Sequence, residues 1–319
     1  MVILTAHSTC RKSNKERGIF MAKINKAMLP TNDYIFKRIF GYKGKEKIAK
    51  GFIEAITNHK INSIELGEST ILEKDLNDDK IGILDVKAVL NNNMQCNIEI
   101  QVVNKSDIEK RLLYYWSKLY GKNIKEGEDY WKLKNTIEIL VADFELEKLK
   151  TIPKFHTEFK IREKEFHSTV LTDALEIHII ELPKILKKIE NGEVDKKDRL
   201  TLWTIFLINP DKIGGKEMSD NEELKEAKEL YEQIQSSERE QELAELRLKY
   251  IRDNNAIQKY GYEHGYEKGR EDENIAGKKE LIKERKKIAK KLLALGLDIK
   301  QIQEITQLSI NEIEELKNN

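Results

Sequence analysis

Two segments of alternating apolar residues, joined by three asparagines, constrain the fold of this chain more than any other feature. Every second residue is apolar over residues 84–90 and again over residues 94–102, and Asn91-Asn92-Asn93 lies between them. A period of two is typical of β-strands, because successive side chains point to opposite faces of a sheet. Asparagine tolerates the backbone conformations that a short turn needs. The pattern predicts an antiparallel hairpin over residues 81–103 with one apolar face against the core.

The other face of this hairpin carries the candidate chemistry. Pairing of Leu90 with Met94 across the turn places Asp85 directly opposite Glu99. Like charges opposite each other destabilise a strand pair, so these two indicate a cation between the carboxylates. Mg²⁺ takes oxygen ligands, often one or two protein carboxylates with waters and phosphate oxygens. Lys87 and Gln101 lie on the same face, where either is placed to orient a water or to donate to a phosphate.

A plainer interpretation of the same face stays open at this point. Charged residues are ordinary on the solvent side of an antiparallel hairpin, so Asp85 and Glu99 could face water without binding anything. The register is also assumed from the turn, and a slip of one residue would separate the two carboxylates.

Helical and strand patterns alternate around the hairpin and predict an α/β domain. Apolar residues recur at helical spacing over residues 32–40 and 45–58, and a third helix is predicted over residues 107–120. Further strands are predicted near residues 61–72, 136–144, 155–166 and 175–180. In the third helix, Arg111 and Lys118 lie on one face and suit either phosphate contact or surface ion pairs. Its aromatic residues Tyr114, Trp116 and Tyr120 are expected in the core.

The second half of the chain has a different composition. Residues 221–290 are rich in Glu, Lys, Gln and Arg, which predicts a long charged helix. Within it, Gly261, Gly265 and Gly269 share one helical stripe, which fits either close approach of helices in a homodimer or a flexible linker. The last forty residues predict three short helices like a helix-turn-helix unit. Residues 278–291 hold eight basic and two acidic residues beside that unit, which suits DNA or a solvated helix face.

Composition excludes several classes of protein and sets the expected domains. The net charge is only +1, so nucleic-acid binding would need local basic patches. Two cysteines give no disulfide framework, which favours a reducing cytoplasm. We find no apolar run of membrane-spanning length and no Gly-rich phosphate loop, so neither a membrane partner nor a nucleotide cofactor is expected. The six histidines show no ligand spacing and receive no role. We expect a disordered tail over 1–21, a core over 22–215, a charged helical arm over 216–276 and a helical tail over 277–319.

Several of these segments, in this order, resemble one known family. Asn32-Asp-Tyr-Ile-Phe-Lys-Arg-Ile-Phe-Gly41 resembles the opening signature of the recombination-promoting nuclease (Rpn) family, also described as PD-(D/E)xK nuclease family transposases. Leu84-Asp85-Val86 and Ile98-Glu99-Ile100-Gln101 resemble its pair of active-site strands. Arg111 to Tyr120 looks like the helix that follows, and Glu181-Leu-Pro-Lys184 resembles the segment that ends its core sheet. The resemblance covers roughly residues 28–215.

The resemblance implies a restriction-endonuclease-like core with a mixed sheet, dependence on Mg²⁺ or another divalent cation, and cleavage of DNA. Asp85 and Glu99 would be metal ligands, and Gln101 would stand where the wider superfamily has its motif lysine. Lys87, one step along the same face, would supply the missing ammonium group. Asp33 is either a helix N-cap or a third acidic group near the metal, and Arg111 is a possible accessory residue.

We therefore expect a metal-dependent DNA endonuclease, linked by the resemblance to recombination or mobile elements. Two other functions stay open. One is a nuclease-like protein that binds DNA without cutting it, because Gln101 replaces lysine. The other is an oligomeric interaction protein that assembles through its helical arm.

Overall fold

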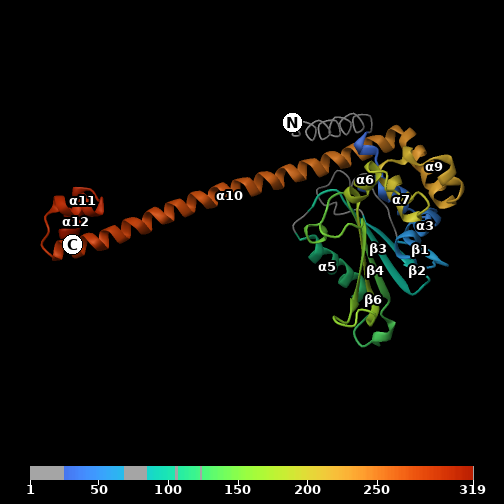
Figure 1. Cartoon of the computed structure of the whole chain (residues 1–319), viewed down its shortest axis with the longest axis horizontal. Helices are drawn as coiled ribbons and strands as arrows, with labels where there is room; N and C mark the ends of the chain where they lie inside the picture. The colour runs from blue at the N-terminus through green and yellow to red at the C-terminus, as the bar shows by residue number, and fades with distance from the viewer. Residues whose placement is uncertain (1–24, 68–84, 105–106, 123, 319) are drawn as a thin grey trace, which may run out of the picture. The chain divides into compact units, whose positions relative to one another are not determined.

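The computed structural model describes residues 25–67, 85–104, 107–122 and 124–318, and it divides into two compact units (Figure 1). The first unit ends at residue 249 and the second begins at residue 250. None of the described helices is both long enough and apolar enough to cross a membrane.

The first unit is built on one mixed sheet, which confirms the predicted α/β class. Its strands run in the order β1-β2-β3-β4-β6-β5. The inner pairs β3–β4 and β4–β6 are parallel, and the outer pairs are antiparallel. The bounds of the strands are β1 Ile64–Leu66, β2 Val86–Leu90, β3 Met94–Gln101, β4 Asn135–Ala142, β5 His156–Arg162 and β6 Val170–Glu181.

Helices pack on both faces of this sheet, with α5 on one side and α3 and α7 on the other (Figure 1). The α-helices of the unit are α2 Asp33–Phe40, α3 Glu46–Thr57, α5 Ile108–Gly121, α6 Leu182–Glu190, α7 Arg199–Ile208, α8 Gly215–Ser219, α9 Glu222–Ser236 and the start of α10 Glu238–Ala294. Short 3₁₀ turns are η1 Lys26–Met28, η2 Tyr130–Lys132, η3 Glu147–Leu149 and η4 Pro210–Lys212.

The larger core lies under α2, α3 and α7. Phe36, Phe40, Phe52 and Trp203 are all buried there, and neighbouring rings have centroids 4.6–6.1 Å apart. Aromatic pairs at these separations add to the stability gained from burying their area. This core fixes the apolar face of the β2–β3 hairpin, since Val86 and Ile98 are both fully buried in it.

The hairpin has the predicted register. Leu90 pairs with Met94 and Val86 pairs with Ile98. Asn91 and Asn92 adopt positive φ angles of 50° and 61°, a conformation that asparagine tolerates better than most residues. Residues 81–84 of the predicted first strand lie outside the described residues.

The polar face of β3 is buried, so its interpretation as a solvent face is wrong. From Gln95 to Gln101 every residue of β3 is buried, including Asn97 and Glu99. Helix α5 and the η3 turn cover this face of the sheet. Ile108 and Leu112 of α5 pack against β4 and β6 and form a second core with the η3 turn. A polar row therefore runs inside the protein beside this second core.

The compact unit extends beyond the expected core end at residue 215. Helix α9 buries Leu224, Ala227, Tyr231 and Ile234 against the larger core, and Ala244 near the start of α10 is buried there too. These apolar positions are sparse in a charged segment, which is why composition alone suggested an exposed arm.

The opening segment Asn32–Arg38 holds the start of α10 in place. The Asn32 side chain caps α2 and its amide also donates to the Ala244 carbonyl at 3.1 Å. The Asp33 carboxylate accepts three hydrogen bonds of 2.6–3.0 Å from the Arg247 guanidinium, and both side chains are buried. Arg38 pairs with Glu240 at 2.7 Å. Asn32, and not Asp33, is therefore the N-cap of this helix.

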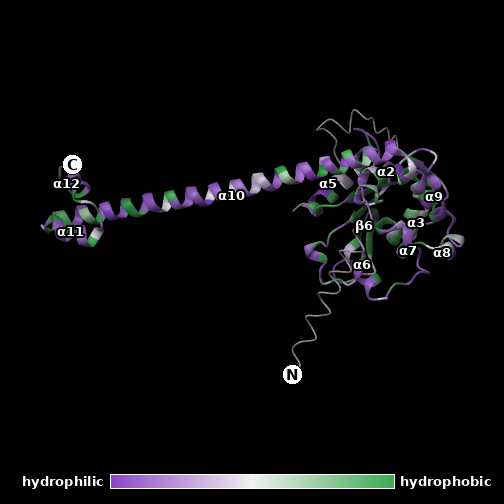
Figure 2. Cartoon of the chain, turned by 90° about the horizontal axis from the view of Figure 1, so that it is seen from above, coloured by the Kyte–Doolittle hydropathy of each residue, from purple (hydrophilic) through white to green (hydrophobic). Residues whose placement is uncertain are grey.

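The second unit contains the remainder of α10 with α11 Ile299–Thr306 and α12 Ile310–Asn318. Its small core buries Ala289, Ile302, Leu308 and Ile313. Asp298 forms a capping box with Gln301. The three short helices predicted for the tail are thus present, the first as the end of α10. Between the two cores α10 is mostly hydrophilic (Figure 2).

Removal of the Arg247 guanidinium should destabilise the first unit strongly. Arg247→Met leaves the buried Asp33 carboxylate without its partner, and breaking a buried pair in this way costs about 3–5 kcal/mol. We expect that loss in the free energy of unfolding from urea titration, with partial recovery in Asp33→Asn/Arg247→Met. The matched control is Arg252→Met at an exposed position of the same helix, and an equal loss in both single variants would contradict the assignment.

Candidate active site

Glu99 is the centre of the polar row on β3. Its side chain is only 2% exposed. The Gln101 amide nitrogen donates a short hydrogen bond to Glu99 Oε1, and Arg111 Nη2 lies 3.2 Å from the same oxygen. Burial of a carboxylate is costly unless it is paired and hydrogen-bonded, and here β3 and α5 supply both kinds of partner. The predicted residues Glu99, Gln101 and Arg111 therefore meet at one point.

Asp85 lies at the start of the same hairpin. Val86 pairs with Ile98, so continuing the register by one residue places Asp85 opposite Glu99. Lys87 Nζ lies 2.9 Å from Asp85 Oδ2, with the Asp85 side chain 29% exposed and that of Lys87 59% exposed. Lys87 thus neutralises Asp85 from the solvent side.

A third acidic residue, Glu138, joins this row from β4, and the sequence analysis missed it. Parallel pairing places it beside Asn97, whose amide donates to Glu138 Oε1 at 2.7 Å. Burial raises the pKa of Glu138 well above its usual range, and the negative charges of Glu99 and Asp85 raise it further. The three carboxyl groups are therefore electrostatically coupled across β2, β3 and β4.

Two buried oxygens at this point have no hydrogen-bond partner in the described part of the chain. They are Oε2 of Glu138 and Oδ1 of Asn97. Unsatisfied buried oxygens next to carboxylates suit a hard cation with its waters, because such a cation takes oxygen ligands. Among the described residues, however, no three His, Cys, Asp or Glu side chains gather tightly enough to form a complete protein cage for a metal. The donor set fits Mg²⁺, which binds through one or two carboxylates and keeps several waters.

Lys37 of α2 is a second residue that the sequence analysis missed. Its side chain is half-buried, and no described residue makes an ion pair or hydrogen bond with it. A Cβ placed on Gly41 would lie 3.0 Å from Lys37 Cγ and 3.1 Å from Val86 Cγ2, so the lysine stem passes close to the hairpin. Burial lowers the pKa of Lys37, while the charge of Asp85 raises it. The only signal in the sequence is a lysine next to Arg38 in a helix that is otherwise mostly apolar after Asp33.

The helix that supplies Arg111 also presents aromatic residues to solvent. Arg111 lies over the Tyr115 ring at 5.8 Å, and Lys118 lies over the Tyr114 ring at 4.9 Å. The expectation that Tyr114 lies in the core is wrong, since it is 52% exposed. Trp116 is partly buried and its indole nitrogen donates to the Thr136 carbonyl at 3.1 Å. The helix thus packs only one narrow face, and its charged aromatic side borders the site through Arg111.

Asp33 does not belong to this group of side chains. Both of its carboxylate oxygens accept hydrogen bonds from Arg247. It fixes the start of α10 on α2, and we leave it out of the proposed metal site.

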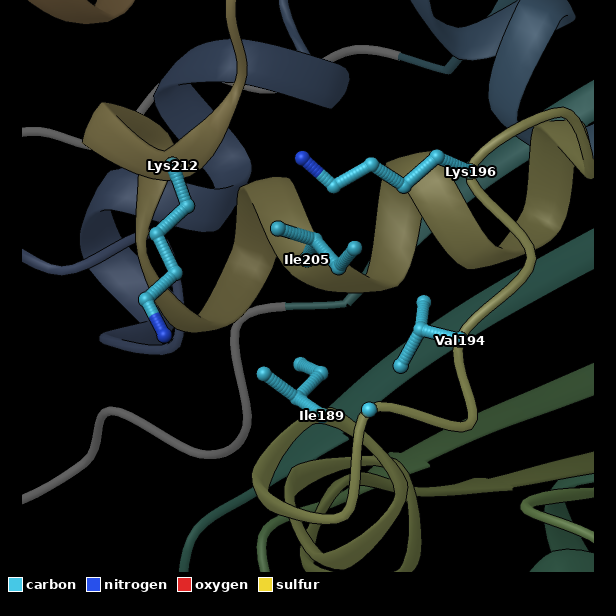
Figure 3. Close-up of a pocket in the computed structure, with 6 residues that line it drawn as sticks. Ile189, Val194, Lys196, Ile205 and Lys212 are labelled. Carbon is cyan, nitrogen blue, oxygen red and sulfur yellow. The ribbon is translucent and has the colours of Figure 1, made fainter.

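A pocket of about 320 Å³ lies elsewhere, beside α6 and α7 (Figure 3). Ile189, Val194 and Ile205 make its wall apolar, and the side chains of Lys196 and Lys212 border it. Its lining residues include two lysines and no carboxylate, so it does not suit a cation.

Histidines that are far apart in the sequence form a hydrogen-bonded network around Glu176. His59 and His178 both contact the Glu176 carboxylate, at 3.0 and 2.7 Å, and His156 lies 2.9 Å from His178. Burial opposes ionisation of Glu176, but the hydrogen bonds from His178 and His59 prevail and lower its pKa to about 2. Burial, helped by His178, lowers the pKa of His156 to about 4. Three of the six histidines, to which the sequence analysis gave no role, therefore take part in hydrogen bonds within the fold.

This network predicts acid sensitivity. The pKa of His156 falls from 6.5 to about 4 on folding, so the unfolded chain binds more protons between these pH values. The contribution to stability is complete above pH 6.5 and is lost as the pH falls toward 4. We expect His156→Gln to flatten this part of the curve of unfolding free energy against pH, measured by urea titration. His167→Gln, at an exposed position, is the control, and an unchanged slope in His156→Gln would refute the prediction.

Comparison with known proteins identifies the family of this chain. Residues 30–261 match the model of the PD-(D/E)XK nuclease family transposases, and residues 283–318 match the C-terminal HTH domain of the Rpn/YhgA-like nuclease family. No curated protein and no solved structure matches the chain. The first match covers more than two thirds of the sequence and includes every residue of the site described above. The chain therefore belongs to the PD-(D/E)XK nuclease family transposases and carries an Rpn/YhgA-type helix-turn-helix domain at its C-terminal end.

Proposed function

We propose that this protein is a DNA endonuclease that hydrolyses phosphodiester bonds with Mg²⁺ or a similar cation held by Asp85 and Glu99. The observation that carries the proposal is the buried Glu99, opposite Asp85 and beside the unsatisfied oxygens of Glu138 and Asn97, in a domain of a nuclease family. Such a cation would lower the pKa of a bound water and polarise the scissile phosphate.

The surrounding side chains have separate tasks in this proposal. Gln101 and Arg111 hold the Glu99 carboxylate in one orientation. Burial raises the pKa of Glu138, so this carboxyl group takes up a proton more readily than an exposed glutamate does, which limits the negative charge that opposes the approach of a phosphate. Lys87 and Lys37 bring positive charge to the Asp85 end of the hairpin.

Lys37 is the better candidate for the ammonium group that Gln101 does not provide. Lys87 is mostly exposed and already paired with Asp85. Lys37 is half-buried with no such partner among the described residues. A cation in a partly buried place stabilises developing charge on a phosphate more than one in water does.

The family assignment and the helix-turn-helix domain both support DNA as the substrate. The link to recombination or mobile elements rests on the family description alone, and a cytoplasmic location remains an expectation. Dimerisation through α10 is also still a prediction. A Cβ on Gly261, Gly265 or Gly269 would meet nothing within 4 Å in the single chain, which leaves that stripe open to a partner helix.

A DNA-binding protein that does not cut is the second candidate. One observation favours it. Gln101 stands where the wider superfamily has its motif lysine, and its amide donates to Glu99, while Arg111 pairs with the same carboxylate oxygen. Glu99 would then serve the fold and would not bind a cation.

The first test is cleavage of supercoiled plasmid by the purified full chain with Mg²⁺, Mn²⁺ or EDTA. We expect metal-dependent nicking that falls by about 100-fold or more in Asp85→Asn and in Glu99→Gln, because each removes a carboxylate from the cation. Glu109→Gln is the matched control, since Glu109 lies on the Arg111 helix and forms a surface ion pair with Lys148. Plasmid binding without cleavage under any metal would favour the second candidate.

A second test separates the two lysines. We expect Lys37→Met to lower the cleavage rate by about 10- to 100-fold through loss of transition-state stabilisation, and Lys87→Met to lower it much less. Lys43→Met, at an exposed position after α2, controls for loss of a surface charge. A larger loss in Lys87→Met than in Lys37→Met would assign the ammonium role to Lys87 instead.

A further inference from the structure

The last turns of α10 carry a row of lysines that the candidate active site does not use. We call Lys279, Lys283, Lys286, Lys287 and Lys290 the lysine stripe. All are exposed except Lys286, which is half-buried. None of the five makes an ion pair or a hydrogen bond with another residue in the described part of the chain.

Helical geometry places these lysines together. Residues three or four apart lie on one face of an α-helix, and the stripe follows that spacing. Ala289, Leu292 and Leu293 from the same turns pack against α11 and α12, so the stripe borders this small core and Lys286 is half-buried at its edge. The stripe covers eleven residue steps, or about 16 Å of helix axis. Over that length one strand of a DNA duplex presents about five phosphates.

Helix α12 has the opposite charge. Residues 299–318, which form α11, the turn and α12, contain two lysines against four glutamates. Three of these, Glu312, Glu314 and Glu315, lie in α12. Glu312 also accepts hydrogen bonds from the backbone and hydroxyl of Ser309, at 2.9 and 2.7 Å, so it faces the start of the helix.

This charge distribution conflicts with the usual docking of a helix-turn-helix unit. In that mode the second helix enters the major groove and its N-terminal residues reach the base edges. Here that end of α12 would bring carboxylates between two rows of phosphates, which is unfavourable. The ammonium groups of the lysine stripe suit phosphate contacts, which position a protein on DNA without reading its sequence.

We propose that this protein binds the backbone of double-stranded DNA through the lysine stripe of α10, and that α12 does not enter the major groove. The inference rests on the proposed function for the identity of the partner. The C-terminal unit would then bind DNA whatever its base sequence. Cleavage sites would then be chosen by the catalytic unit.

The test measures binding alone. The full chain is titrated against a fluorescent 30-base-pair duplex in EDTA, by anisotropy, at several NaCl concentrations between about 50 and 250 mM. Each phosphate contact contributes about −0.9 to the slope of log K against log salt. We expect the triple variant Lys283→Gln/Lys287→Gln/Lys290→Gln to reduce the steepness of this slope by about 2 to 3 and to bind at least 10-fold more weakly in low salt.

Matched variants address each half of the proposal. Lys259→Gln/Lys268→Gln/Arg270→Gln removes three exposed basic residues of the same helix outside the stripe, and it should change the slope less than the stripe variant does. Asn311→Ala/Glu314→Ala alters the end of α12 that would meet base edges, and it should bind several unrelated duplexes within about two-fold of the wild type.

Three results would overturn the inference. They are an unchanged slope in the stripe variant, a selective loss of binding in the α12 variant, and no duplex binding by the wild-type chain. Because EDTA prevents metal-dependent cleavage, a chain that binds as expected but never cuts would refute the nuclease proposal and leave this one standing.

Discussion

The burial of Glu99 is the constraint on which the candidate site depends. A carboxylate that is removed from water loses much of its hydration. It stays charged only where hydrogen-bond donors or cations replace the lost water. Gln101 comes from the same strand and Arg111 from the helix that covers the sheet, so both partners are in place once β3 and α5 have packed. The pairing holds the carboxylate still, which favours a site with one fixed ligand geometry over a mobile acidic surface.

The parallel pairing of β3 with β4 adds a feature that the hairpin alone cannot have. It places Glu138 beside Asn97, two residues away from Glu99 along β3. Two ionised carboxylates at such close range in a buried place repel each other, and the raised pKa of Glu138 expresses that repulsion together with burial. The row therefore combines a carboxylate that is paired with the Arg111 guanidinium and a neighbouring carboxyl group whose pKa is raised.

Features that depend on neighbouring residues could be predicted from the sequence, whereas contacts between distant segments could not. The register of the β2–β3 hairpin follows from alternation and from Asn91 and Asn92, because a turn and a period are local properties. Glu138 and Lys37 were missed because their places depend on a parallel strand and on a helix packed across the sheet, and neither leaves a mark on nearby residues. The same reason explains Asp33. A residue at a helix start suggests a cap, but its partner Arg247 lies more than two hundred positions away.

Helix α2 connects these long-range features in eight residues. Its first turn holds the start of α10 through Asp33 and Arg247, and its last turns place Lys37 beside the hairpin strand that follows Asp85. One helix therefore carries both the residue that anchors α10 and a candidate catalytic lysine. The position of Lys37 depends on the same burial of Phe36 and Phe40 that anchors α2 in the core.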